Sequence, residues 1–175
     1  MFFSTADIKN ISGIDRDAVL SLDDRQLLDL CRVEAFTGSG PGGQHRNRNY
    51  TAVRIIFKAF QEFSAEDSVN RSQKQNIASA LQKLRIKMAL LWRKDALELY
   101  NYTHFNTSNI LYALELARLL DIVKSCNFDH KEAALRLNLS NSKLLKELYR
   151  LPEVWQQFQA ARAESGLMEL KPPRN

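Results

Sequence analysis

A cluster of glycines near the start of this 175-residue chain limits what the surrounding sequence can fold into. Four of the six glycines lie within six residues, at positions 38, 40, 42 and 43. Glycine accepts positive φ and lets the backbone approach a ligand closely, so this density predicts a loop rather than a helix or a strand. Gln44 then supplies a side-chain amide, and Arg46 and Arg48 follow it. The arrangement indicates a backbone-built catalytic loop that faces a polyanion.

The sequence on either side of this loop predicts an α+β fold, with a small mixed sheet and a long helix packed on it. The stretches next to the loop are rich in β-forming residues, and the apolar residues after position 70 recur at helical spacing. The expected elements are a helix over residues 23–32 capped by Ser21, strands over residues 33–36, 52–58 and 60–65, and a helix from residue 70 to about 100. Lysines 74, 83, 87 and 94 lie off the apolar stripe of that last helix. They could face solvent or contact RNA, and the sequence favours neither.

The chain after residue 107 is expected to form a small all-helical domain. Helices are predicted over residues 109–123, 129–138, 142–149 and 152–165, with Gly166 ending the last one. The polar stretch 100–107 has the composition of a linker, so the expected division is an extension over 1–20, a catalytic domain over 21–100 and a helical domain over 108–170.

Residues 130–145 are similar to a helix-turn-helix. Ala134 is small where two helices would cross, Leu139 would fill the turn, and Ser140 could cap the second helix. The residues that would decorate that second helix are Asn141, Ser142, Lys143 and Lys146. Such helix pairs bind nucleic acid in some proteins and other proteins elsewhere, so both kinds of partner remain open.

Positive charge is concentrated around the glycine loop. The whole chain carries +5, and residues 33–100 hold eleven Lys/Arg against six Asp/Glu. Residues 1–32 hold four against six, and residues 101–175 hold ten against eight. A basic segment favours approach to a phosphate backbone and makes binding sensitive to salt. The distribution therefore favours a nucleic-acid partner for the loop.

The remaining composition indicates a cytoplasmic protein without a metal or an organic cofactor. The first seven residues lack the cationic segment and long apolar core of a secretory signal, and the sequence contains no run of eighteen apolar residues. The only cysteines, Cys31 and Cys126, lie far apart without a metal-ligand spacing, which predicts two reduced thiols.

Three blocks of residues identify a relationship. They are Ser39-Gly40-Pro41-Gly42-Gly43-Gln44-His45 followed by Asn47, then Thr51-Ala52-Val53-Arg54-Ile55, then Arg71-Ser72-Gln73 with Asn76. At this spacing, residues 27–90 resemble the catalytic domain of class I peptide-chain release factors. These factors use a Gly-Gly-Gln loop to hydrolyse the ester between a finished peptide and its tRNA.

The resemblance implies roles for individual residues. Gly42, Gly43 and Gln44 would be catalytic, with the backbone N–H of Gln44 stabilising the departing ribose oxygen and its side chain admitting water. A general-base role for His45 is disfavoured. The expected RNA contacts are His45, Arg46, Asn47, Arg48, Arg54, Arg71 and Gln73, whereas Ser72 and Asn76 are expected to be structural. The implied partners are large-subunit rRNA and peptidyl-tRNA, with a methyltransferase acting on Gln44 as a candidate, and the protein is expected to be a monomer away from membranes.

The residues that precede the matching segment are too few for a stop-codon-reading domain. The preferred hypothesis is therefore codon-independent hydrolysis of peptidyl-tRNA on stalled ribosomes or detached large subunits. Two alternatives stay open: a non-catalytic ribosome or RNA-binding factor that retains the fold, and a DNA-binding regulator that uses the helix-turn-helix.

Overall fold

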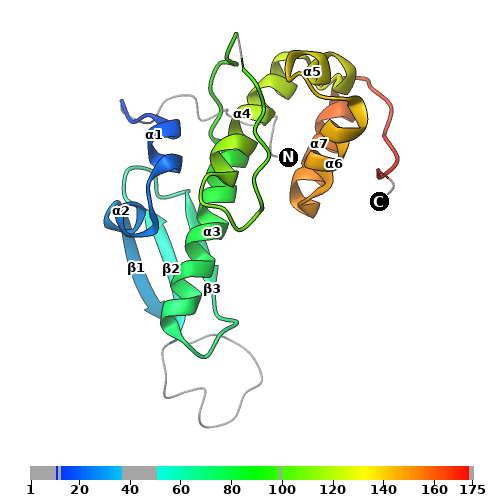
Figure 1. The fold of residues 1–175 in the computed structure, drawn as a ribbon. Helices are drawn as coiled ribbons and strands as arrows, with labels where there is room; N and C mark the ends of the chain where they lie inside the picture. Colours follow the sequence, from blue (N-terminus) through cyan, green and yellow to red (C-terminus); the bar gives the residue numbers. More distant parts are fainter. Residues whose placement is uncertain (1–10, 12, 37–50, 99, 174–175) are drawn as a thin grey trace. The chain divides into compact units, whose positions relative to one another are not determined.

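A computed structural model describes residues 11, 13–36, 51–98 and 100–173 (Figure 1). Contacts divide the chain into two compact units, one within residues 10–89 and the other from Leu90 onward. The first unit holds two short helices, a sheet and most of a long helix, and the second holds four helices. The α+β class predicted from the sequence is therefore confirmed.

The first unit opens with two short helices, α1 (Arg16–Ser21) and α2 (Asp24–Asp29). The predicted cap of the second helix was wrong, because Ser21 ends α1 and its hydroxyl donates to the carbonyl of Ala18 at 2.8 Å. Asp23 caps α2 instead, through a reciprocal pair of bonds with Gln26 at 2.8 and 3.1 Å. Such a capping box satisfies two backbone donors at once, which outweighs the single bond a serine cap supplies.

The sheet has three strands in the order β1 (Cys31–Phe36), β2 (Ala52–Phe57) and β3 (Ser64–Asp67). Both pairings are antiparallel. The sheet was expected to be mixed, but in the described residues it is purely antiparallel. The third strand begins at Ser64 rather than at residue 60. The reason is a tight turn in which the Phe57 N–H donates to the Phe63 carbonyl at 2.9 Å and the two rings of Phe60 and Phe63 meet edge to face.

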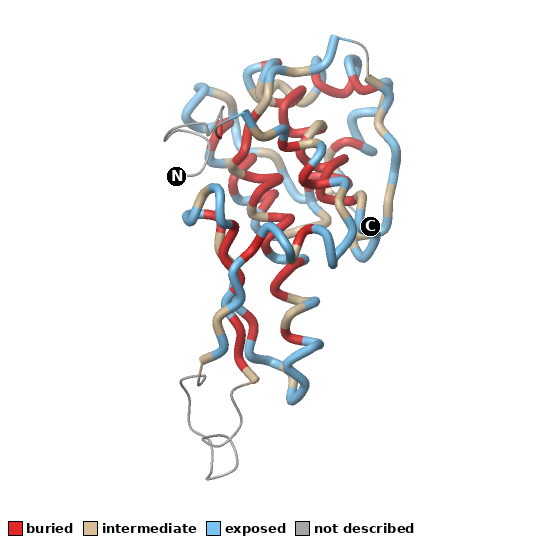
Figure 2. The backbone as a smooth tube through the Cα atoms, turned by 90° about the vertical axis from the view of Figure 1, so that its left-hand side faces the viewer, coloured by how far each residue is buried: buried red, intermediate tan, exposed pale blue. Residues whose placement is uncertain are grey.

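Helix α3 (Gln73–Leu91) runs alongside β3 in the opposite direction. Lys83 near its middle donates to Asp67, and Lys87 one turn later donates to the carbonyls of Glu62 and Ser64. Its inner side is apolar and its buried positions are red in Figure 2. The core of this unit combines Val53, Ile55 and Phe57 of β2 with Ala80, Leu81, Leu84 and Met88 of α3.

Helix α3 ends nine residues earlier than the sequence predicted, at Leu91. The backbone N–H of Lys94 donates to the Asp121 carboxylate at 3.2 Å, a donor that a continuing helix would have used internally. Arg93 is buried and bonds the same carboxylate at 3.0 Å and the Ala117 carbonyl at 3.2 Å. Contacts with a later helix therefore override the local helical pattern.

The second unit contains α4 (Tyr112–Ser125), α5 (His130–Arg136), α6 (Asn141–Tyr149) and α7 (Pro152–Glu164). The four predicted helices are confirmed, with ends shifted by up to three residues. Gly166 ends α7 with φ +74°, and its N–H donates to the Ala163 carbonyl.

No helix in the described ranges is both long and apolar enough to cross a membrane. Cys31 and Cys126 are buried free thiols, and burial raises the pKa of Cys31 to about 11.

Candidate catalytic and RNA-contacting site

The structure defines the two ends of the segment that carries the predicted catalytic residues. Residues 37–51 join β1 to β2, and Phe36 at the end of β1 pairs with Ala52 at the start of β2. The segment therefore leaves and re-enters the sheet at one place, between adjacent antiparallel strands. The predicted catalytic residues Gly42, Gly43 and Gln44, and the predicted RNA contacts His45, Arg46, Asn47 and Arg48, lie outside the described residues.

Arg54, predicted to contact RNA, lies between two carboxylates on the exposed face of the sheet. The register places it opposite Glu34 on β1 and Glu66 on β3. Its Nε donates to Glu66 at 2.5 Å, its Nη1 lies 3.8 Å from Glu34, and its guanidinium packs over the Phe36 ring. These partners were not identified from the sequence, because only the strand register brings them together. The RNA role of Arg54 stays a prediction, and RNA would compete with two carboxylates for its guanidinium.

The block Arg71-Ser72-Gln73 lies at the start of α3 and its side chains are exposed. The side chains of Arg71 and of Lys74, three residues later, form no hydrogen bond or ion pair with another described residue. Further along α3, by contrast, Lys83 and Lys87 bind β3, and Arg85 bonds Asp24 at 2.6 Å. Among the described residues, the basic side chains without a protein partner in this region are thus Lys74 in the first turn of α3 and Arg71, two residues before the helix begins. Of the α3 lysines that the sequence left open, these contacts make Lys83 and Lys87 structural.

Asn76 is fully buried, as the structural role predicted for it requires. Its Nδ2 donates to the carbonyl of Thr51 at 2.7 Å and to that of Asn70 at 2.9 Å, and its Oδ1 accepts from the Asn70 N–H at 2.8 Å. One side chain on α3 thereby holds both the residue where the chain re-enters the sheet and the turn after β3.

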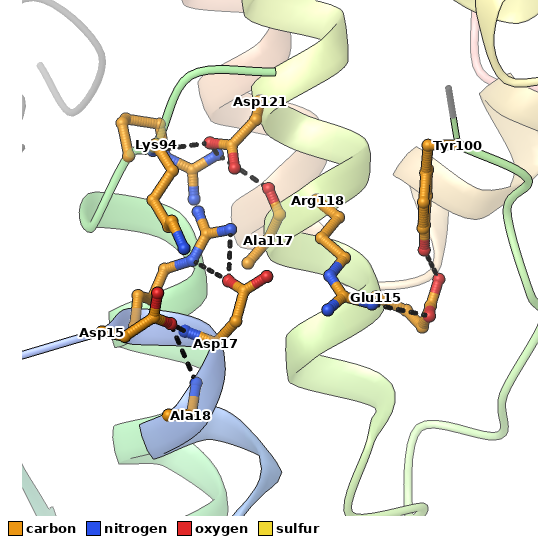
Figure 3. Close-up of polar contacts among 11 residues, drawn as sticks. Asp15, Asp17, Ala18, Lys94, Tyr100, Glu115, Ala117, Arg118 and Asp121 are labelled. Atoms are coloured by element: carbon orange, nitrogen blue, oxygen red, sulfur yellow. Dashed lines mark hydrogen bonds and ion pairs between the residues drawn. The ribbon is translucent and has the colours of Figure 1, made fainter. Parts of the chain in front are cut away.

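In the second unit, the stretch expected to be a linker is fixed to two helices through buried carboxylates. Glu115 of α4 accepts from the Tyr100 hydroxyl and from the Thr103 N–H, and Arg118 approaches it from the same helix (Figure 3). Asp121, six residues further along α4, accepts a hydrogen bond from the Lys94 N–H, which the same view shows. The stretch 100–107 is therefore part of the helical unit and does not have the free character of a linker.

The second carboxylate is Glu147 on α6, which is 7% exposed and has three donors. The Tyr102 hydroxyl donates at 2.8 Å, Arg150 Nη1 lies at 3.0 Å, and His104 Nδ1 lies at 2.6 Å. Burial pushes the pKa of Glu147 upward, but the hydrogen bonds from Tyr102, Arg150 and His104 outweigh burial and keep that pKa below its ordinary value of 4.5. Burial, and then the nearby Glu147, raise the pKa of Tyr102.

Helices α5 and α6 have the local geometry of the predicted helix-turn-helix. Asn138 takes φ +52°, the Leu139 N–H bonds the Ala134 carbonyl at 2.9 Å, and Ser140 caps α6 through the Lys143 N–H. Ala134 is fully buried, as the close crossing requires. The predicted surface residues Asn141, Ser142, Lys143 and Lys146 are all exposed on α6.

The charge on this surface of α6 is one-sided. Lys143 and Lys146 lie three residues apart, which places them on one face of the helix. Neither ammonium pairs with a carboxylate in the part of the chain that the structure describes. The one carboxylate of α6, Glu147, is buried. The face is therefore positive, although the formal charge of residues 101–175 is nearly balanced.

Comparison with known proteins supports the relationship that the motif residues indicated. Residues 26–105 match the RF-1 domain family. Peptide chain release factor 1 of Rickettsia typhi is 27% identical over 171 residues, covering 83% of this chain and 44% of its own length. Peptide chain release factor 2 of the same species is 36% identical over 75 residues, covering 43% and 19%, and that of Lactiplantibacillus plantarum is 33% identical over 90 residues, covering 49% and 24%.

Residues 26–105 therefore resemble an RF-1 domain, and the chain is release-factor-like. It spans between about a fifth and less than half of the length of these curated relatives. No solved structure matches it significantly.

Proposed function

We propose that this protein hydrolyses the ester of peptidyl-tRNA in the peptidyl-transferase centre of stalled ribosomes or detached large subunits, without reading a codon. The observation that carries the proposal is the RF-1 match over residues 26–105, together with an intact Gly42-Gly43-Gln44 in the segment that joins β1 to β2. The partners are then large-subunit rRNA and peptidyl-tRNA, in the cytoplasm. A monomeric state and a methyltransferase acting on Gln44 belong to the same proposal.

The chemistry follows from the transition state of ester hydrolysis. When water attacks, negative charge grows on the former carbonyl oxygen and on the departing ribose oxygen, and a donor aimed at either atom lowers the barrier. One such donor contributes roughly 2.7–4 kcal/mol in comparable acyl-transfer sites. Gly42 and Gly43 allow the tight backbone path that would bring the Gln44 N–H to the departing oxygen. The Gln44 side chain would admit water and exclude larger nucleophiles.

Electrostatics near the loop support an RNA partner. Arg71 and Lys74 leave their charges unpaired within the described residues, close to Asn76, whose amide bonds the backbone where the loop re-enters the sheet. Phosphate groups would satisfy these cations without breaking any protein contact that the structure shows. The α6 face supports a second contact with RNA, because Lys143 and Lys146 offer charge for binding the phosphate backbone.

The test is peptide release from purified complexes that hold peptidyl-tRNA. The panel contains a stop codon, a sense codon, a truncated message and an isolated large subunit, and compares wild type with Gln44→Ala and with Gln61→Ala. Gln61 makes a matched control because it is exposed in the turn between β2 and β3. Gln44→Ala keeps the backbone N–H but loses the side chain that admits and orients water, so we expect release to fall about 100-fold while binding is kept. Gln61→Ala should behave as wild type.

The outcomes separate the hypotheses. Release that depends on Gln44 and is equal at stop and sense codons supports the proposal. Release only at the stop codon would support hydrolysis of peptidyl-tRNA but reject its independence from the codon. Binding to every complex without release would replace the enzyme by a non-catalytic ribosome factor. Preference for duplex DNA over ribosomes at matched salt would favour the DNA-binding regulator.

A further inference from the structure

The buried amide of Asn76 is the last protein contact before the catalytic segment that the structure describes. The sheet register holds the backbone on that side only as far as Ala52, which pairs with Phe36. Asn76 extends the hold by one residue, since its Nδ2 donates to the Thr51 carbonyl at 2.7 Å. Gln44 lies seven residues before Thr51 in the sequence.

The geometry of this contact is closely specified. Both N–H groups of the Asn76 amide are used, one on Thr51 and one on the Asn70 carbonyl, and its oxygen accepts from the Asn70 N–H. The side chain is fully buried, so its removal leaves the Thr51 and Asn70 backbone groups without their partner inside the fold. An asparagine at this place therefore locks α3, the turn after β3 and the end of the catalytic segment into one arrangement.

We infer that Asn76 is a positioning residue for peptide release, acting through the Thr51 carbonyl on the placement of the Gly42-Gly43-Gln44 backbone. This inference rests on the proposed function. A backbone N–H stabilises a developing charge only when it is held at hydrogen-bond distance from it, and a misplacement of about 1 Å costs on the order of 100-fold in rate. Asn76 does not touch substrate, so its contribution lies in the rate of release rather than in binding.

Two substitutions test this role. Asn76→Ala removes all three hydrogen bonds, whereas Asn76→Asp keeps the shape and the acceptor for the Asn70 N–H but turns a carboxylate oxygen toward two carbonyls. Single-turnover release is measured over a range of protein concentrations, at a temperature where circular dichroism shows every variant folded. We expect the maximal rate to fall about 100-fold in both variants. The half-saturating concentration should change by less than about threefold.

Matched controls separate positioning from stability. Leu84→Ala opens a cavity in the same helix and the same core, away from Thr51, and lowers the melting temperature without touching the segment's end. Asn70→Ala alters the turn after β3 but keeps the backbone N–H and carbonyl that Asn76 uses. Both controls should release peptide at the wild-type maximal rate while folded.

The pH profile of Asn76→Asp gives a readout that a structural role alone would not move. Burial against two carbonyls raises the pKa of the introduced carboxyl group, and its protonated form can again donate to Thr51. The deficit relative to wild type should therefore narrow from about 100-fold at pH 8 to about tenfold at pH 6, whereas that of Asn76→Ala should stay constant.

Three results would overturn the inference while leaving the proposed function intact. They are a wild-type maximal rate in folded Asn76→Ala, an equal loss in Leu84→Ala at matched stability, and a deficit in Asn76→Asp that does not change with pH. Absence of release by the wild-type protein in every complex would instead reject the proposed function and the positioning role together.

Discussion

Glu147 should be one of the most sensitive positions for the stability of the helical unit. Its carboxylate is buried and receives hydrogen bonds from Tyr102, His104 and Arg150. Two of these donors belong to the 100–107 stretch, so the carboxylate ties that stretch to α6. Replacing Glu147 by alanine leaves three donors without their acceptor and frees the stretch from the helix.

The cost can be worked out from the exposure of the partners. Breaking a buried ion pair by removing one member typically costs about 3–5 kcal/mol. The Arg150 side chain is 20% exposed and that of His104 is 55% exposed, so water can partly replace the lost acceptor. We therefore expect the low end, about 3 kcal/mol for Glu147→Ala. Glu147→Gln keeps the shape and one acceptor oxygen and should cost about 1.5 kcal/mol.

Urea unfolding followed by tryptophan fluorescence measures this quantity directly. Trp92 and Trp155 are the only tryptophans, and both belong to the unit that begins at Leu90. The matched control is Glu132→Gln on the exposed side of α5, which should change stability by no more than about 0.5 kcal/mol. A loss below about 1 kcal/mol in Glu147→Ala would show that the network contributes no more than an exposed ion pair, and would refute the reasoning.

The pH dependence provides a second check of the same prediction. Because the folded pKa of Glu147 lies below its ordinary value of 4.5, the carboxylate contributes its full stability above that value. The contribution is lost as the pH falls from about 4.5 through the folded pKa. The stability difference between wild type and Glu147→Gln should therefore shrink between pH 6 and pH 3. A difference that stays constant would mean that the carboxylate is not held in its charged form by its three donors.

Two further predictions concern α5 and α6. Replacing Lys143 and Lys146 together by glutamate should weaken ribosome binding and reduce the steepness of the plot of log binding constant against log salt concentration by about 1–2. The control Lys171→Glu should leave this slope unchanged. Equal slopes for wild type, the double variant and the control would exclude contact of α6 with phosphate. Asn138→Ala should lower the stability of the helical unit by about 1 kcal/mol, because Asn138 takes φ +52°, which alanine adopts only with strain. Asn138→Gly should cost less, because glycine adopts this φ freely. A larger loss for glycine than for alanine in urea unfolding would contradict this reasoning.

Much of the fold could be predicted because its signals are local. The strand over residues 52–57 and the cap at Ser140 depend on stretches of a few residues, and both match the structure. The helical end at Gly166 likewise needs only one residue that accepts positive φ. Where a local signal was available twice, as at Ser21 and Asp23, the better-paired residue capped the helix.

The failures have a common physical cause, which is contact between residues distant in sequence. Asp121 lies 27 residues after the Lys94 N–H that it accepts, and this contact accompanies the early end of α3. Glu115 and Glu147 have the appearance of ordinary surface acids in their helices, yet both are buried by the stretch 100–107. A polar residue that is buried by hydrogen bonds to another segment cannot be recognised from the hydrophobic periodicity of its own helix, because its partners lie elsewhere in the sequence.

The same contacts change how the charge of the RF-1 domain should be understood. The eleven cations of residues 33–100 predicted a basic segment around the glycine loop, but Arg54 lies between two glutamates and Arg93 is buried against Asp121. Lys83 and Lys87 are bound to the β3 side of the sheet. Each of these side chains already has a carboxylate or carbonyl partner in the protein, with which phosphate would have to compete. Under the proposed function, we therefore expect the attraction for RNA to come mainly from Arg71, Lys74 and the arginines next to Gln44 in the sequence.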